Sequence, residues 1–155
     1  MLHPEIAALL PAFQGKVSWS DIPLSSLRKS LLRNMAALDM TKIDLAIIEN
    51  TTVGNEGYEI PVRVYRPSLE PNLPVLVYLH GGGWVTFNVD SHDSFCRYLA
   101  VHGQCIVVAV DYRLAPEHKF PAALEDVLAV LAWLPSQASQ WQADMQKVAI
   151  AGDSA

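Results

Sequence analysis

The stretch that decides the fold is Val148-Ala149-Ile150-Ala151-Gly152-Asp153-Ser154-Ala155, at the end of the printed sequence. It begins with an apolar run, which is typical of a strand that is covered on both faces. A Gly-x-Ser sequence directly after such a strand is typical of a sharp strand-to-helix turn that exposes a serine oxygen above a sheet. We therefore predict that Ser154 is a nucleophile, with Asp153 beside a substrate pocket.

A second signal lies upstream, where His80-Gly81-Gly82-Gly83-Trp84 follows the apolar residues 74–79. Glycines have no Cβ, so their backbone amides can approach the oxyanion of a reaction intermediate closely. Each well-aimed donor can contribute on the order of 10²–10³ in rate. A phosphate-binding loop would need a G-x-G-x-x-G pattern or a Walker lysine, and neither is present. The loop therefore predicts backbone oxyanion donors among Gly81, Gly82 and Gly83, and we expect Trp84 to line the substrate pocket.

The hydroxyl of Ser154 needs a base that takes its proton, usually a histidine backed by a carboxylate. In this strand–turn–helix arrangement the base follows the serine in the chain. We therefore expect His80 and Gly81 to support the glycine loop, and we do not expect His80 to be the base. The backbone amide of Ala155, which follows the nucleophile, is the third expected oxyanion donor. None of the five histidines has the paired spacing that is typical of a metal site.

Residues 1–40 differ from the rest of the chain, because their apolar residues recur at helical spacing. One such pattern runs from Ile6 to Phe13, and a second runs from Leu24 to Leu38. The second carries three basic residues, which we expect on a solvated face opposite the packed stripe: Arg28, Lys29 and Arg33. So few charges do not indicate binding to a membrane surface. The change of pattern predicts a helical N-terminal segment, residues 1–40, followed by a different unit, residues 41–155.

Strand patterns begin near Lys42. Apolar and polar residues alternate over 43–47 and again over 58–66, with a Gly/Asn turn signal at 53–57 between them. This pattern predicts a β-hairpin, and Pro61 places it near the edge of a sheet.

Three later runs are apolar throughout and alternate with helical patterns. The apolar runs cover residues 75–79, 105–110 and 148–151, and the helical patterns cover 90–103 and 121–134. Such runs suit strands of a mostly parallel sheet that helices cover on both faces. The order strand, helix, strand, helix, strand predicts an α/β fold.

A polar loop, Asp111-Tyr112-Arg113-Leu114-Ala115-Pro116-Glu117, follows the second of these apolar runs. Loops at the carboxyl ends of strands face the active site in open α/β sheets. Arg113 is expected to pair with Glu117 or Asp111 in a partly buried ion pair, although solvated loop charges are the alternative.

The composition limits the number of domains, the partners and the cellular compartment that we expect for the protein. The chain has 155 residues, which suffice for one domain or part of one, and a net charge of −5. Without a basic run, we expect neither nucleic acid nor anionic lipid as a partner. We find no signal-peptide pattern and no apolar run near the roughly 20 residues of a membrane helix. We expect a reducing cytoplasm, with Cys96 and Cys105 as small buried side chains.

Three motifs, in this order and spacing, together resemble the hormone-sensitive lipase family of esterases and lipases. They are His80-Gly81-Gly82-Gly83-Trp84, the loop 111–117 with Phe120-Pro121-Ala122, and Gly152-Asp153-Ser154-Ala155. The resemblance implies an α/β-hydrolase fold. Residues 1–40 are similar to that family's N-terminal helical cap segment, and residues 41–155 would form the N-terminal part of the catalytic domain. It also implies cis peptide bonds at Ala115-Pro116 and Phe120-Pro121.

The same resemblance implies serine carboxylester hydrolysis through an acyl-enzyme, without a cofactor. It assigns the nucleophile to Ser154 and the oxyanion hole to the amides of Gly82, Gly83 and Ala155. The substrates would be small-molecule esters of short- to medium-chain acids.

Members of that family are considerably longer, and their catalytic acid and histidine follow the serine. We therefore expect residues 1–155 to be one segment of a longer polypeptide and to be inactive alone. The partner of residues 1–155 would be the remaining C-terminal half of the same polypeptide. Whether that polypeptide forms a homodimer stays open. Two other functions stay open as well, namely a non-catalytic, receptor-like protein that binds a small molecule, and an amide or carbamate hydrolase of the same fold.

Overall fold

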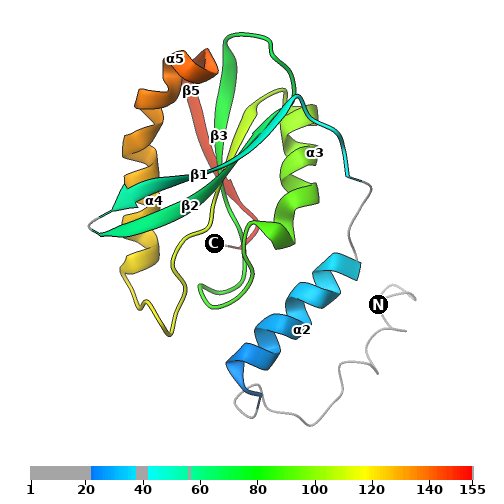
Figure 1. Cartoon of the computed structure of the whole chain (residues 1–155), viewed down its shortest axis with the longest axis vertical. Coiled ribbons are helices and arrows are strands. Elements are labelled where there is room, and N and C mark those ends of the chain that lie inside the picture. Colours follow the sequence, from blue (N-terminus) through cyan, green and yellow to red (C-terminus); the bar gives the residue numbers. More distant parts are fainter. Residues whose placement is uncertain (1–21, 38–41, 56, 155) are drawn as a thin grey trace, which may run out of the picture.

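The structure is a computed structural model that describes residues 22–37, 42–55 and 57–154. Its strands are β1 (Ile47–Asn55), β2 (Tyr58–Arg66), β3 (Leu73–Leu79), β4 (Ile106–Val110) and β5 (Ala143–Gly152) (Figure 1). Its helices are α2 (Leu24–Ala37), α3 (Asp93–Gly103), α4 (Ala122–Trp133) and α5 (Ala138–Trp141), with short 3₁₀ helices η2 (Asp90–His92) and η3 (Leu134–Gln137). The helix predicted over residues 6–13 lies outside the described residues. Within those ranges, no helix is long and apolar enough to span a bilayer.

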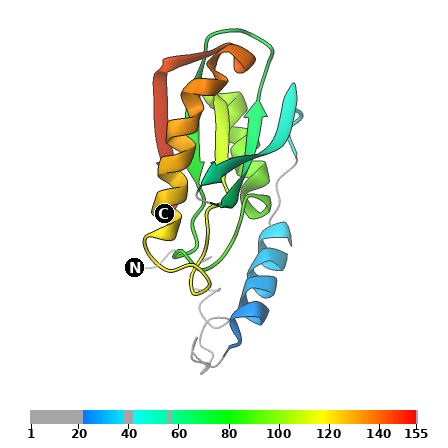
Figure 2. The same cartoon turned by 60° about the vertical axis from the view of Figure 1, so that its left-hand side comes forward.

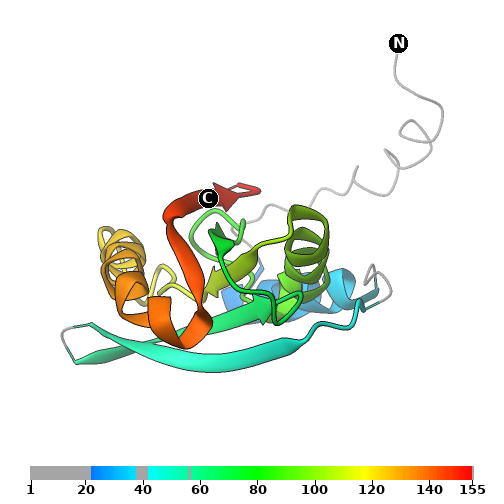
Figure 3. The same ribbon diagram turned by 90° about the horizontal axis from the view of Figure 1, so that it is seen from above.

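The described strands form one sheet in the order β1-β2-β4-β3-β5. β3 pairs with β4 and with β5 in parallel, as the three apolar runs predict. β1 and β2 form the predicted hairpin, and β2 also pairs antiparallel with β4, so the sheet is mixed. The hairpin lies at an edge of the sheet, as predicted, although Pro61 is in β2 and the edge strand itself is β1. The hairpin runs along one side of the molecule in Figure 3.

Helices cover both faces of this sheet, as predicted. Successive side chains of a strand point to opposite faces, so each face of the sheet packs against its own helix. On one face, side chains of β2, β3 and β4 pack against α4 and the segment after it: Val62, Val64, Val75, Val77, Ile106, Val108, Ala123, Val130 and Leu134. On the other face, α3 covers a second cluster: Tyr65, Tyr78, Val107, Ala109, Cys96 and Ala100. Figure 2 shows α3 and α4 on opposite sides of the strands. Both cysteines are buried and free, as expected.

The register of the parallel strands brings the three motifs to one edge of the sheet. Leu79 at the end of β3 lies opposite Gly152 of β5 and also opposite Val110 of β4. The residues that follow each strand therefore leave the sheet side by side. These are the glycine loop after β3, the loop 111–117 after β4, and Asp153 with Ser154 after β5.

Some predicted boundaries are wrong. β1 begins at Ile47 and continues through the predicted turn to Asn55, because it pairs residue by residue with β2 as far as Asn55 and Tyr58. The predicted end of the helix before Pro135 is confirmed, because α4 ends at Trp133. The 3₁₀ helix η3, which follows it directly, was not predicted; a proline at the start of a helix needs no N–H partner there. α5 was not predicted at all.

β5 also departs from its prediction as a strand covered on both faces. Val148 is 40% exposed and Ile150 is 54% exposed. These side chains are exposed because β5 lies at the edge of the described sheet.

Candidate active site

The glycine loop and the end of β5 contact each other directly. The backbone N–H of Gly81 donates to Asp153 Oδ1 at 2.7 Å, across 72 residues of sequence. A Cβ at position 81 would lie 2.4 Å from Asp153 Oδ2 and 3.2 Å from the Cβ of Ser154. Glycine therefore fits at this point, whereas a side chain at position 81 would displace the carboxylate of Asp153 or the glycine loop. Two predicted motifs meet here.

The glycine loop has a left-handed backbone over three residues, with φ of +126° at Gly82, +60° at Gly83 and +63° at Trp84. The carbonyl of Gly82 accepts hydrogen bonds from the N–H of Val85 at 3.1 Å and from the N–H and Oγ1 of Thr86, both at 3.0 Å. Among the residues that the structure describes, nothing accepts a hydrogen bond from the N–H of Gly82 or Gly83. Both amides can therefore donate to a ligand oxygen.

Ser154 follows β5 and is exposed. No hydrogen bond within the described part of the chain joins it to a histidine. Ala155, the third predicted oxyanion donor, lies outside the described residues.

Asp153 ties the nucleophile segment to its surroundings. Besides the amide of Gly81, its Oδ1 accepts the hydroxyl of Tyr78 at 2.7 Å, and its Oδ2 lies 3.4 Å from Nε2 of His92. Burial alone would raise the pKa of Asp153, but the hydrogen bond from Tyr78 and the nearby His92 outweigh burial and hold that pKa below its usual value. Asp153 is therefore a carboxylate at neutral pH, and it fixes the start of the glycine loop.

His80 is 1% exposed and lies under the glycine loop. Its Nδ1 donates to the carbonyl of Gly81 at 2.8 Å, and its ring stacks on Tyr112 with centroids 4.3 Å apart. The hydroxyl of Tyr112 in turn donates to the carbonyl of His80. Burial lowers the pKa of His80, so the ring is neutral when it donates from Nδ1.

The loop 111–117 also supports the glycine loop through a backbone hydrogen bond. The N–H of Ala115 donates to the carbonyl of Trp84 at 2.8 Å. Both peptide bonds that the family resemblance indicated as cis, Ala115-Pro116 and Phe120-Pro121, are cis.

The predicted partners of Arg113 are wrong. Arg113 pairs with Asp126 of α4, whose side chain is fully buried, at 2.7 Å. The same carboxylate also accepts the backbone N–H of Arg113 at 2.9 Å. Asp126 prevails because it lies beneath the loop with its oxygens pointing at Arg113, whereas Glu117 has another partner.

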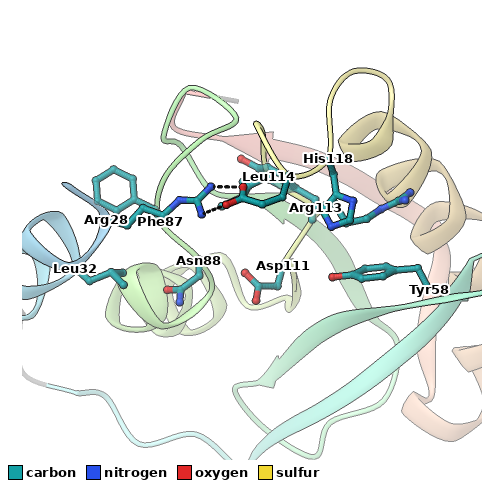
Figure 4. A pocket seen from close by; sticks show the side chains of 11 residues that line it. Arg28, Leu32, Tyr58, Phe87, Asn88, Asp111, Arg113, Leu114 and His118 are labelled. Atoms are coloured by element: carbon teal, nitrogen blue, oxygen red, sulfur yellow. Dashed lines mark hydrogen bonds and ion pairs between the residues drawn. The ribbon is translucent and has the colours of Figure 1, made fainter. Parts of the chain in front are cut away.

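That partner is Arg28, which sequence reasoning placed on a solvated face of α2. Its side chain is only 26% exposed, and it forms a two-pronged ion pair with Glu117 at 2.8 and 2.9 Å. Figure 4 shows it reaching from α2 toward the loop that carries Leu114.

Two cavities adjoin the site. The larger has a volume of about 410 Å³ and lies between α2, the hairpin and the loop 111–117; Figure 4 shows most of its walls, which include Arg28, Tyr58, Asn88 and Asp111. The smaller has a volume of about 320 Å³ and mostly apolar walls, among them Trp84, Phe120, Pro121 and Leu124. Neither lining includes Ser154 or Asp153.

Residues 76–155 match the protein family described as alpha/beta hydrolase fold. The chain belongs to the α/β-hydrolase family. This match and relatives that are esterases confirm both the predicted fold and the resemblance to the hormone-sensitive lipase family.

The relatives of this α/β-hydrolase chain include carboxylesterase NlhH of Mycobacterium tuberculosis. It is 52% identical over 110 residues, which are 70% of this chain and 34% of that protein. Ethyl acetate hydrolase of Pseudomonas putida is 37% identical over an alignment of 163 residues, covering 99% of this chain and 51% of that protein. The solved structure of a hyperthermophilic esterase from the archaeon Pyrobaculum calidifontis matches with a TM-score of 0.89 at 36% identity, covering 98% of this chain and 49% of that one. The chain thus spans about a third to a half of the length of these relatives.

Sequence reasoning missed three side chains that hold this site: Tyr78, Tyr112 and Arg28. Tyr78 did carry a signal, since it is the one polar side chain in the apolar run of β3 and lies next to its end. Arg28 carried none, because its partner Glu117 is 89 residues away.

Proposed function

We propose that the protein containing this chain is a serine carboxylester hydrolase. The observation that supports the proposal is the contact between Gly81 and the Asp153–Ser154 segment, together with two amides of the same loop, Gly82 and Gly83, that donate to no acceptor within the described residues. The names of the relatives, a carboxylesterase and an ethyl acetate hydrolase, support an ester as the substrate.

The proposed reaction has two steps. Ser154 Oγ bonds to the ester carbonyl carbon while its proton passes to a histidine of the full-length protein. The carbonyl oxygen becomes an oxyanion that accepts hydrogen bonds from the amides of Gly82, Gly83 and Ala155. The bond to the alcohol then breaks as the histidine returns the proton to the alcohol oxygen. Water releases the acid from the acyl-enzyme by the same route and restores the hydroxyl of Ser154.

We propose esters with short- to medium-chain acyl groups as substrates. The apolar cavity of about 320 Å³ beside Trp84 supports a small apolar substituent. The contacts of Asp153 support a different role from the predicted one, because they hold the glycine loop and do not line that cavity.

We propose further that residues 1–40 form the cap segment and residues 41–155 the first part of the catalytic domain. The hydrogen bonds from Arg28 of α2 to the loops around the site support a cap in that position.

The test is Ser154→Ala in the full-length protein, with hydrolysis of p-nitrophenyl acetate and butyrate as the assay. The turnover number should fall by about 10⁴–10⁶, the range seen when a catalytic-triad member is removed. Ser139→Ala, which removes an exposed hydroxyl on α5, is the matched control and should keep wild-type turnover. Retained turnover in Ser154→Ala would refute the assignment. A wild-type protein that binds an ester analogue without turnover would favour a receptor-like function instead.

A further inference from the structure

Arg28 occupies a junction between three segments that are far apart in the sequence. Its Nε donates to the carbonyl of Val85 at 2.7 Å, at the end of the glycine loop. One terminal nitrogen donates to the carbonyl of Ala115 at 2.8 Å. Both terminal nitrogens bind the carboxylate of Glu117. One side chain of α2 thus holds the glycine loop and the loop 111–117 together.

The backbone positions that Arg28 binds are those that set the shape of the glycine loop. The N–H of Val85 donates to the carbonyl of Gly82, so the peptide that Arg28 holds adjoins the turn around Gly82. The N–H of Ala115 donates to the carbonyl of Trp84, so the second carbonyl that Arg28 binds belongs to the residue bracing that turn.

The loop needs such support, because its backbone is in an uncommon region. Trp84 has φ +63°, in the left-handed region that residues with a Cβ rarely adopt. Such conformations persist where the surroundings fix them from several directions. Arg28 and Ala115 supply contacts on one side, and Asp153 supplies one at Gly81 on the other.

We propose that Arg28 is a positioning residue that aims the oxyanion amides of Gly82 and Gly83, with Glu117 orienting its guanidinium group. This inference rests on the proposed esterase function. Arg28 acts through the backbone of Val85 and Ala115 and does not touch the reacting atoms. Its loss therefore weakens stabilisation of the transition state more than binding of the ester, and it lowers kcat more than it raises KM.

The test compares Arg28→Met, Arg28→Lys and the control Lys29→Met in the full-length protein, well below the unfolding temperature of each variant. A displacement of about 1 Å at a reacting centre costs on the order of 10²-fold in rate, so we expect Arg28→Met to lower kcat by about 10- to 100-fold, with KM nearly unchanged. Arg28→Lys should recover little of this loss, because an ammonium group cannot donate in a planar fork. Lys29 is exposed on the same helix, so Lys29→Met should match the wild type.

Glu117→Gln keeps the inference testable if Arg28→Met does not fold. It should lower kcat by a smaller factor, and it should have no further effect when it is added to Arg28→Met. Hydrogen exchange of the peptide spanning residues 81–86 is the second measurement, and it should be faster in Arg28→Met.

Three results distinguish the inference from the function on which it rests. An active wild type with unchanged kcat in both Arg28→Met and Glu117→Gln would overturn the role of Arg28. Unchanged exchange in the loop peptide would do the same, whether or not the wild type is active. A wild type that turns over no ester, with faster exchange in Arg28→Met, would overturn the esterase proposal and leave the support of the loop by Arg28 in place.

Discussion

Gly81→Ala tests the contact on which the candidate site is built. Gly81 has a φ that alanine can adopt, in contrast to Gly82 and Gly83, so the substitution adds a methyl group without backbone strain. That carbon would lie 2.4 Å from Asp153 Oδ2 and 3.0 Å from Asp153 Cγ. The carboxylate of Asp153, which the N–H of Gly81 and the hydroxyl of Tyr78 hold in place, must therefore shift by about 1 Å relative to the glycine loop to restore ordinary van der Waals contact. A displacement of this size at a reacting centre costs on the order of 10²-fold in rate. Overpacking of this kind also destabilises by about 1–3 kcal/mol.

The assay measures kcat for p-nitrophenyl acetate and the free energy of unfolding in urea, both in the full-length protein. Gly57→Ala is the matched control. Gly57 has φ +88° in the turn of the hairpin, and apart from its own atoms and its chain neighbours, no atom of the described residues lies within 4 Å of a Cβ placed there. Gly57→Ala should lose about 1–2 kcal/mol of stability through its left-handed backbone, with unchanged kcat. Gly81→Ala should lose similar stability but about 100-fold in kcat.

Repeating the Gly81→Ala substitution in an Asp153→Ala variant identifies the atoms that cause the loss of kcat. In Asp153→Ala the carboxylate that the new methyl group meets is absent, so Gly81→Ala should lower kcat by a much smaller factor there than in the wild type. An equal loss in both backgrounds would refute the reasoning, because the clash would then involve something other than Asp153.

Two further predictions concern the ion pairs around the loop 111–117. Asp126→Asn breaks the ion pair between the fully buried carboxylate of Asp126 and Arg113, and should lower the free energy of unfolding, measured in urea, by about 3–5 kcal/mol. Glu125→Gln, at an exposed carboxylate 3.6 Å from the same guanidinium, should lower it by less than about 1 kcal/mol. The hydrogen bond from Arg28 lowers the pKa of Glu117 from 4.5 to about 2, so the pair stabilises the fold fully above pH 4.5 and less as the pH falls toward 2. Urea midpoints measured across that interval should fall more steeply in the wild type than in Glu117→Gln, and parallel curves would contradict the pairing.

The parts of the fold that could be predicted are those with a local signal. β4 is apolar over its whole length because helices cover both of its faces, and all five of its residues are buried. The motif residues of the candidate site could be predicted for a similar reason, since Gly-x-Ser after an apolar strand and His-Gly-Gly-Gly after another each describe one short turn. The sequence order alone did not state that the turns meet, but parallel strands with Leu79 opposite Gly152 bring them together.

The parts that could not be predicted depend on partners distant in the sequence. Arg113 has several carboxylates nearby, and the choice of Asp126 follows from where α4 packs and not from spacing. Gly54 and Asn55 are typical turn residues, yet pairing with β2 keeps them in β1. Arg28 resembles any exposed basic residue of an amphipathic helix until the fold brings Glu117 to it.

The central claim is that the hydroxyl of Ser154 and the amides of the glycine loop surround one reacting carbon. A crystal structure of the full-length protein treated with a p-nitrophenyl alkylphosphonate tests it most directly, because the phosphonate resembles the tetrahedral intermediate. We predict phosphorus bonded to Ser154 Oγ, with the phosphonyl oxygen about 2.7–3.1 Å from the N–H nitrogens of Gly82 and Gly83. A phosphonyl oxygen that points away from both amides, or a phosphonate attached to a residue other than Ser154, would contradict the claim.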